Sequence, residues 1–233
     1  MFFKLPFEIL LTNITRNIKE GRHASYGSII IKMTKVKLCG LSRPCDIEYA
    51  NELTPDYIGF VFAEFSKRYV SVNTAEMLSK KLNKEIVPVG VFVNESTDFI
   101  VDIIERKIIR AVQLHGNEDN SYIHRLQNVT DCMIIKAIAV RNEEDIKEAN
   151  SSLADIVLLD TGCGTGRTFN WTLLKKATRP YFLAGGLTSD NVSEAISEFA
   201  PYGVDASTSI ETDGYKDKQK MAAFINAVKH GKE

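Results

Sequence analysis

The chain has 233 residues, 44% of them hydrophobic, which is enough to bury a large core as one barrel-sized domain or as two smaller ones. Its 29 lysines and arginines almost balance its 30 aspartates and glutamates, and no run of like charges suits nucleic acid or an anionic membrane surface. No stretch is apolar for long enough to span a bilayer, so we expect a small-molecule ligand and neither a membrane nor a nucleic-acid partner.

Residues 1–32 precede the regular pattern of the chain. Their start, "MFFKLPFEILL", is interrupted by charged residues and a proline and lacks the small residues of a cleavage site, so we expect no signal peptide. Two interpretations of this N-terminal extension stand: an extra helix packed on the main domain, or residues ahead of a natural start at Met33. We assign the extension no chemistry and place the catalytic domain at 33–233.

From residue 36 onward, short apolar runs alternate with helical patterns. Eight runs are rich in Val, Ile, Leu and Phe without strict polar alternation, which is typical of strands covered on both faces. The predicted strands cover 36–41, 57–63, 86–93, 111–116, 133–140, 156–161, 181–187 and 203–208.

Amphipathic stretches of helical length lie between these runs. They include 71–82, 95–107, 143–153, 189–199 and 216–230. Ser42 ahead of Pro44, Ser71 and Ser189 are predicted N-caps. Eight strand-then-helix units in about 200 residues predict an α/β fold, an eight-stranded parallel (β/α)8 TIM barrel, because an open doubly wound sheet usually stops near five or six strands.

The first predicted strand, "VKLCGL", has a cysteine followed by a glycine near its C-terminal end. Its two-residue period places Lys37 and Cys39 on one face. We therefore expect Cys39 at the C-terminal mouth of the barrel, where active sites of this fold lie, with Lys37 below it favouring the thiolate, the form that acts as a base. The alternative is that Cys39 is a small apolar filler.

The cysteines are widely spaced and form neither a CxxC pair nor a Cys/His cluster with zinc-like spacing. We therefore expect no metal site and a reduced, cytoplasmic compartment. The other three keep the interpretation of filler or loop residues: Cys45, Cys132 and Cys163.

Two further candidates follow the second and fourth predicted strands. Arg68, in "AEFSKRYVS", is suited to a bidentate pair with a ligand carboxylate, and the alternative is a solvated loop arginine. His115 ends the fourth strand, where it either lines the mouth or is a hydrogen-bonded histidine at the barrel rim.

Asp160 ends the sixth predicted strand, after three apolar residues. An aspartate there is either catalytic or an acceptor that ties a loop. With Cys39 it would supply the acid and the base that a proton-moving isomerase needs on opposite sides of a ligand. The glycines of the following "TGCGTGRTFNW" have GxGxG spacing after a sixth strand, which disfavours NAD binding, and we expect a mobile loop that closes over the site.

Glycines and small hydroxyl residues follow the seventh and eighth predicted strands. Loops in these places often hold phosphate in barrels, although glycine pairs also form ordinary turns. The phosphate candidates are Gly185, Gly186, Ser207, Thr208 and Ser209. Asp205, within the eighth strand, is interpreted either as a ligand for a substrate amine or as a member of a network that positions other groups.

Taken in order, several stretches resemble the phosphoribosylanthranilate isomerase family, barrel enzymes of tryptophan biosynthesis. They are "VKLCGL", "IGFVFAEFSKRYVS", "VGVFVN", "VQLHG", "LLDT" with "GTGRTFNW", "LAGGLTSDNV" and "VDASTSIET" with "GYKD". The resemblance runs from about residue 36 to the C-terminus and covers nearly all of the predicted barrel.

The resemblance implies an Amadori rearrangement of N-(5-phosphoribosyl)anthranilate to 1-(2-carboxyphenylamino)-1-deoxyribulose 5-phosphate, with no cofactor. It implies Asp160 as the general acid at the furanose oxygen, Cys39 as the general base at sugar C2, and Arg68 as the anchor of the anthranilate carboxylate. The backbone around the glycine pair and the strand-8 loop would hold the phosphate. Both a monomer and a homodimer remain open.

Two positions depart from the family pattern. Ser209 stands where the family has glycine after a serine pair, which would narrow the approach of the backbone to phosphate. Cys163 stands where the family has the first glycine of a "GGTG" run, which would alter loop mobility.

Two other functions compete with this one. Another phosphate-binding barrel, such as a sugar-phosphate epimerase or indole-glycerol-phosphate synthase, would need a metal-binding His/Asp set or a catalytic Lys/Glu pair at strand ends, and neither is evident. A catalytically dead barrel that binds a phosphorylated ligand as a sensor would have no need of both Cys39 and Asp160.

Overall fold

The computed structural model describes residues 34–160 and 171–230. The N-terminal extension and the expected mobile loop with Cys163 lie outside these residues, so the expectations for them stay predictions.

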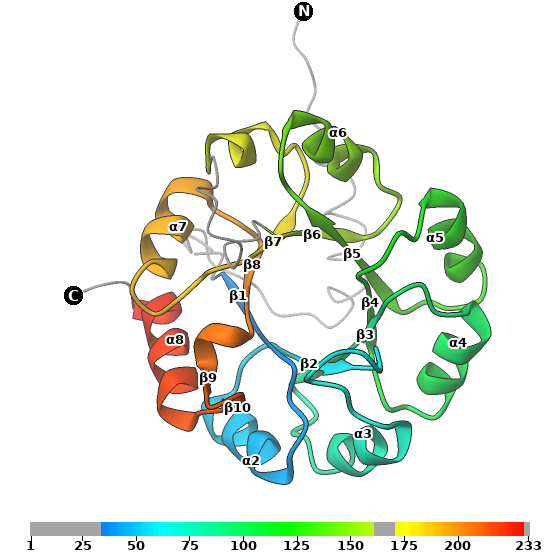
Figure 1. The fold of residues 1–233 in the computed structure, drawn as a ribbon, viewed down its shortest axis with the longest axis vertical. Helices are drawn as coiled ribbons and strands as arrows, with labels where there is room; N and C mark the ends of the chain where they lie inside the picture. Colours follow the sequence, from blue (N-terminus) through cyan, green and yellow to red (C-terminus); the bar gives the residue numbers. More distant parts are fainter. Residues whose placement is uncertain (1–33, 161–170, 231–233) are drawn as a thin grey trace, which may run out of the picture. The chain divides into compact units, whose positions relative to one another are not determined.

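Within the described residues, eight parallel strands close into a barrel in the order of the sequence (Figure 1). Each predicted run contains its strand to within one residue, which confirms the predicted fold class. The strands are β1 (Lys35–Cys39), β2 (Tyr57–Val61), β3 (Val87–Phe92), β4 (Ala111–Leu114), β5 (Met133–Ala139), β6 (Ile156–Asp160), β7 (Tyr181–Ala184) and β8 (Gly203–Ala206).

Helices surround the strands as an outer ring (Figure 1). They are α2 (Pro44–Leu53), α3 (Val72–Ser79), α4 (Thr97–Glu105), α5 (Asn120–Gln127), α6 (Glu143–Ser151), α7 (Val192–Phe199) and α8 (Lys218–His230). Between β6 and β7 the described residues hold only a short 3-10 helix, η1 (Trp171–Lys176). None of the helices in the described part is long and apolar enough to cross a membrane.

An insertion that the apolar pattern does not predict follows β8. It consists of the 3-10 helix η2 (Thr208–Ile210) and a small antiparallel hairpin of β9 (Glu211–Thr212) and β10 (Tyr215–Lys216). The hairpin lies at the rim between α8 and α2 (Figure 1).

One of the three predicted N-caps is confirmed. The Ser71 hydroxyl accepts the Thr74 N–H at the start of α3. The other two predictions are wrong, because neither serine stands at the cap position of its helix. At α2 the cap position is Arg43, and the Asp46 carboxylate accepts the N–H groups of Ser42 and Arg43.

The start of α7 shows the second error, since its cap position is Asn191 rather than Ser189. The Asn191 side chain accepts the Thr188 N–H at 2.8 Å and donates to the Gly186 carbonyl at 3.0 Å. This side chain therefore orders the turn that follows β7 before the helix begins.

The core forms between the strands and the helices and also inside the barrel. The interior is filled towards the N-terminal ends of the strands by a cluster that includes Tyr57, Val89, Leu158 and Phe182. Full burial of such a side chain contributes about 1.5–3 kcal/mol. Because this end is packed solid, a ligand can enter the barrel only from the opposite end.

Candidate active site

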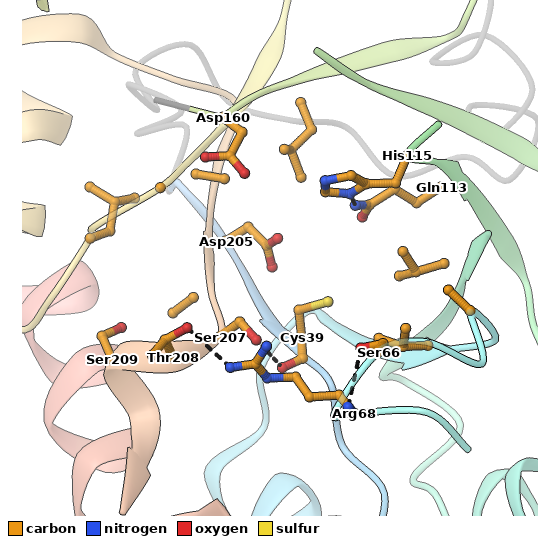
Figure 2. Close-up of a pocket in the computed structure, with 18 of the residues that line it drawn as sticks. Cys39, Ser66, Arg68, Gln113, His115, Asp160, Asp205, Ser207, Thr208 and Ser209 are labelled. Atoms are coloured by element: carbon orange, nitrogen blue, oxygen red, sulfur yellow. Dashed lines mark hydrogen bonds between the residues drawn. The ribbon is translucent and has the colours of Figure 1, made fainter. Parts of the chain in front are cut away.

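A pocket of about 380 Å³ opens at the C-terminal ends of the strands. All the candidate residues predicted from the sequence line it: Cys39, Arg68, His115, Asp160, Gly185, Gly186, Asp205, Ser207, Thr208 and Ser209. Figure 2 shows the Cys39 thiol, the Asp160 carboxyl and the His115 ring directed towards a common space. The structure therefore brings together residues that are spread over 170 positions of the sequence, from 39 to 209.

Cys39 is the last residue of β1 and is 8% exposed. Its strand neighbour is Gly59 of β2, and a Cβ added to Gly59 would lie 2.7 Å from the Cys39 sulfur. Gly59 thus leaves the space that the thiol occupies. The sequence analysis did not single it out, although a glycine inside a strand is a known sign of close approach by another group.

Lys37 is fully buried beneath Cys39, and its Nζ lies 3.0 Å from Oδ1 of Asp205. The two residues are paired in the register that closes β1 onto β8. This supports the interpretation of Asp205 as a network member, since its carboxylate balances a lysine that has no access to water.

Lys37 favours the thiolate of Cys39, as the strand period predicts, although burial has the larger and opposite effect. Burial raises the pKa of the Cys39 thiol above its ordinary value, while the positive charge of Lys37 lowers it by less. Cys39 therefore rests as a thiol at neutral pH, and Lys37 makes deprotonation easier than burial alone would allow.

His115 follows β4 and holds a hydrogen bond of 2.9 Å between its Nδ1 and the Gln113 amide nitrogen. Since an amide nitrogen only donates, Nδ1 accepts and the proton lies on Nε2. Burial, with the positive charges of Lys37 and Lys136, lowers the pKa of His115. A neutral imidazole therefore lines the pocket and is also hydrogen-bonded, so both sequence interpretations of His115 apply.

Arg68 lies in the loop after β2 and is already paired within the protein. Its Nε and Nη2 donate to the two carboxylate oxygens of Glu211 at 2.6 and 2.7 Å. Nη2 also donates to the Thr208 hydroxyl at 3.0 Å. The interpretation of Arg68 as a solvated loop arginine is therefore wrong.

The backbone conformation and the surroundings of residue 40 explain why a glycine follows the cysteine of β1. Its φ is +83°, and a Cβ there would lie 2.4 Å from Cδ of Arg68. A side chain at this position would be strained and would also displace the arginine stem. Cys39 thus supplies the thiol of the pocket, and Gly40 leaves space for the side chain of Arg68.

The loops after β7 and β8 form the remaining wall. Gly185 and Gly186 both have positive φ, a backbone conformation that lets the peptide groups line the pocket without side chains. The Ser207 hydroxyl donates to the Cys39 carbonyl at 3.1 Å and joins this wall to β1. Ser209 lies in η2 and is not among the described residues with positive φ, so a serine fits there without backbone strain.

The main residues that the sequence analysis missed are two buried charges in the β9–β10 hairpin. Glu211 accepts the Arg68 fork, and Lys216 donates to Glu211 at 2.5 Å and to the Ser207 carbonyl at 3.0 Å. Neither residue had a predicted role. In the described part of the chain, no group of three or more His, Cys, Asp or Glu side chains is arranged to hold a metal ion.

Comparisons with known proteins identify the family of the chain. A family model described as N-(5'phosphoribosyl)anthranilate (PRA) isomerase matches residues 36–227. The N-(5'-phosphoribosyl)anthranilate isomerase of Thermoanaerobacter sp. (strain X514) is 46% identical over 204 residues, which cover 84% of this chain and 98% of that protein.

Solved structures show the same barrel. Generated monomers of the dimeric isomerase from Thermotoga maritima match with a TM-score of 0.75 and 36% identity, over 84% of this chain and 99% of that one. An isomerase in complex with reduced 1-(o-carboxyphenylamino)-1-deoxyribulose 5-phosphate matches with a TM-score of 0.74 and 35% identity, over the same shares of the two chains. The chain belongs to the N-(5'-phosphoribosyl)anthranilate isomerase family.

Proposed function

We propose that this protein catalyses the Amadori rearrangement of N-(5-phosphoribosyl)anthranilate in tryptophan biosynthesis, with Asp160 as the general acid and Cys39 as the general base. The observation that carries the proposal is that these two side chains line one pocket together with Arg68 and the loops after β7 and β8. The family membership and the related isomerase that binds a reduced deoxyribulose phosphate support the substrate class.

The first step opens the sugar ring. Asp160 donates its proton to the furanose oxygen, the bond between that oxygen and C1 breaks, and the nitrogen lone pair forms the C1=N bond of a Schiff base. Asp160 is left as a carboxylate. An acid placed at the leaving oxygen typically contributes about a hundred- to ten-thousandfold in rate.

The second step moves the double bond. The thiolate of Cys39, which is the minor form at neutral pH, removes the proton from C2 and becomes a thiol. The C–H electrons form a C1=C2 bond, and the electrons of C1=N return to nitrogen to give an enolamine. Proton transfer from the C2 hydroxyl and protonation of C1 then give the ketone. At the end of the cycle a proton passes from the thiol to the Asp160 carboxylate, which restores both groups. No atom is gained or lost overall, so one acid and one base suffice.

Two further parts of the pocket hold the ends of the substrate. Arg68 binds the anthranilate carboxylate, and the backbone at Gly185 and Gly186, together with the loop after β8, binds the phosphate. His115 accepts from Gln113 at Nδ1, and its neutral ring presents the Nε2–H to the sugar. Asp205 binds Lys37 and acts as a member of the network below the thiol.

The chemistry proposed for Cys39 depends on its thiolate, whose amount is set by the raised pKa. Because that pKa lies above the ordinary value of a thiol, the thiolate fraction should rise about tenfold per pH unit from pH 7 to 9. We expect the rate of Cys39 alkylation by iodoacetamide to follow this rise, measured by mass spectrometry of the peptide that carries it. A rate that levels off below pH 8 would contradict the assignment of burial as the larger effect.

Arg68→Ala is expected to raise KM about ten- to hundredfold with little change in kcat, because the carboxylate loses a charged hydrogen-bonding partner remote from the reacting bonds. Arg68→Lys is the matched variant, which keeps the charge but loses the planar fork, and we expect it to recover only part of the loss. Steady-state kinetics test this. An unchanged KM with a reduced kcat would show that Arg68 is not the carboxylate anchor.

Genetic rescue tests the proposed function as a whole. The chain should restore growth without tryptophan to a strain that lacks only this isomerase, and failure of a soluble, well-expressed chain to do so would refute the proposal.

We place the catalytic domain at 33–233 and assign no role to residues 1–32. A monomer and a homodimer are both consistent with the Thermotoga maritima relative, which is dimeric but was also obtained as monomers. A cytoplasmic location stays a prediction from the spacing of the cysteines in the sequence.

A further inference from the structure

Glu211 is a buried carboxylate that binds two cations at the edge of the pocket. Its side chain is 8% exposed and accepts hydrogen bonds from Nε and Nη2 of Arg68 and from Nζ of Lys216. Glu211 and Lys216 are paired across the β9–β10 hairpin. Glu211 itself is not among the residues that line the pocket.

These contacts decide which part of the Arg68 guanidinium can meet a ligand. Of its five N–H groups, the one on Nε goes to Glu211, and the two on Nη2 go to Glu211 and Thr208. Among the described residues, no group accepts from Nη1. A ligand carboxylate in the pocket therefore meets the Nη1 side of a guanidinium whose plane is already fixed.

The charges of this cluster explain why a carboxylate partner does not cancel the anion-binding capacity of Arg68. Arg68 and Glu211 alone would form a neutral pair. Lys216 adds a second positive charge, and its three acceptors, Oε1 of Glu211 and the carbonyl and hydroxyl oxygens of Ser207, match the three N–H groups of an ammonium. Burial lowers the pKa of Lys216, while the contact with Glu211 opposes this effect. With Lys216 protonated, the cluster carries a net charge of +1 for an incoming anion.

Protonation of Glu211 would undo this arrangement, and its surroundings oppose protonation. Although burial works in the other direction, the contacts with Arg68 and Lys216 lower the pKa of Glu211 below its ordinary value. The carboxylate thus stays ionised throughout the neutral range and keeps both of its oxygens as acceptors.

We propose that Glu211 is a positioning residue for the substrate carboxylate, which holds the Arg68 fork so that Nη1 faces the pocket, while Lys216 preserves the net positive charge. This inference rests on the proposed function, since it takes Arg68 as the anchor of the anthranilate carboxylate. Without Glu211 the flexible arginine must be ordered by the substrate itself, and the side-chain entropy of that step corresponds to about a tenfold weaker binding.

The first test is Glu211→Gln, which keeps the size of the side chain and removes its charge. We expect KM to rise about tenfold and kcat to stay within a factor of about two, because Glu211 acts on binding through Arg68 and touches no reacting atom. Glu76→Gln is the matched control, since Glu76 on α3 also lies between a lysine and an arginine, Lys80 and Arg106, but is remote from the pocket. It should leave both constants unchanged.

A double-mutant cycle separates positioning from a merely structural role. In the Arg68→Ala background, Glu211→Gln should cause no further loss in kcat/KM, because the residue through which it acts is gone. Glu211→Gln also leaves Lys216 buried without its charged partner. The variant Glu211→Gln/Lys216→Met removes both charges, so it tests the role of Glu211 with no uncompensated charge. We expect its KM to rise as much as that of Glu211→Gln, or more.

Three results would overturn the inference. They are an unchanged or lowered KM in Glu211→Gln, an equally large loss in the Arg68→Ala background, and a fall in kcat without a change in KM. The wild-type protein distinguishes this failure from a failure of the proposed function. If the wild type does not turn over phosphoribosylanthranilate at all, the function is wrong, whereas normal wild-type turnover with any of these results refutes only the role of Glu211.

Discussion

Cys39→Ser is expected to lower kcat at least a hundredfold. Serine fits the space that Gly59 leaves for the sulfur, so the shape of the pocket is kept. The hydroxyl, however, is a far weaker acid than the thiol, so the population of the basic form at neutral pH becomes negligible. Removal of a general base typically lowers the rate about a hundred- to ten-thousandfold. Turnover under saturating substrate measures the loss.

The control for this prediction is another cysteine of the same barrel. Cys132 immediately precedes β5 and therefore lies at the end of the barrel opposite to the pocket. Cys132→Ser should retain wild-type kcat, and both variants should show a cooperative thermal unfolding transition. Growth of a tryptophan-requiring strain at near-normal rate with Cys39→Ser would mean that another group removes the C2 proton.

Asp160→Asn is expected to lower kcat by at least a hundredfold as well. Asparagine has almost the same size, but its amide cannot release a proton to the furanose oxygen, so the ring-opening step loses its acid. KM should change less than kcat because Asp160 acts on the leaving oxygen rather than on the carboxylate or phosphate. Rapid single-turnover measurements should show ring opening, rather than product release, as the slow step.

Asp155→Asn is the matched control, because Asp155 lies just before β6, whereas Asp160 is its last residue. The Asp155 carboxylate accepts the Ile134 N–H at 2.7 Å, so its loss should lower the melting temperature without affecting kcat. If Asp160→Asn kept its kcat within about tenfold of the wild type, a smaller loss than an acid usually causes, the proton would have to come from another donor.

The sequence predicted the barrel because strands buried on both faces read as continuous apolar runs. It predicted Cys39, His115 and Asp160 as pocket residues for a related reason, since a polar residue that ends such a run must emerge at the mouth. The hairpin of β9 and β10 was not predictable in this way. Its segment "ETDGYK" is short and polar, which is typical of a solvated loop.

The ionic contacts of the pocket were the least predictable part. Lys37, Glu211 and Lys216 are buried charges. The pairs Lys37–Asp205 and Arg68–Glu211 join segments that are far apart in the sequence, so only the closed barrel shows them. The direction of the effect of Lys37 on Cys39 follows from the strand period alone. How large this effect on the pKa of Cys39 is, compared with the effect of burial, depends on how completely the pocket excludes water. The sequence does not contain that information.

The most direct test of the account is to add the purified protein to freshly prepared phosphoribosylanthranilate and to follow the fluorescence of this substrate. The account predicts a loss of fluorescence that is proportional to protein concentration, together with formation of the deoxyribulose phosphate, and no such loss with the Cys39→Ser/Asp160→Asn variant. Fluorescence that decays no faster with the wild-type protein than in buffer alone would contradict it.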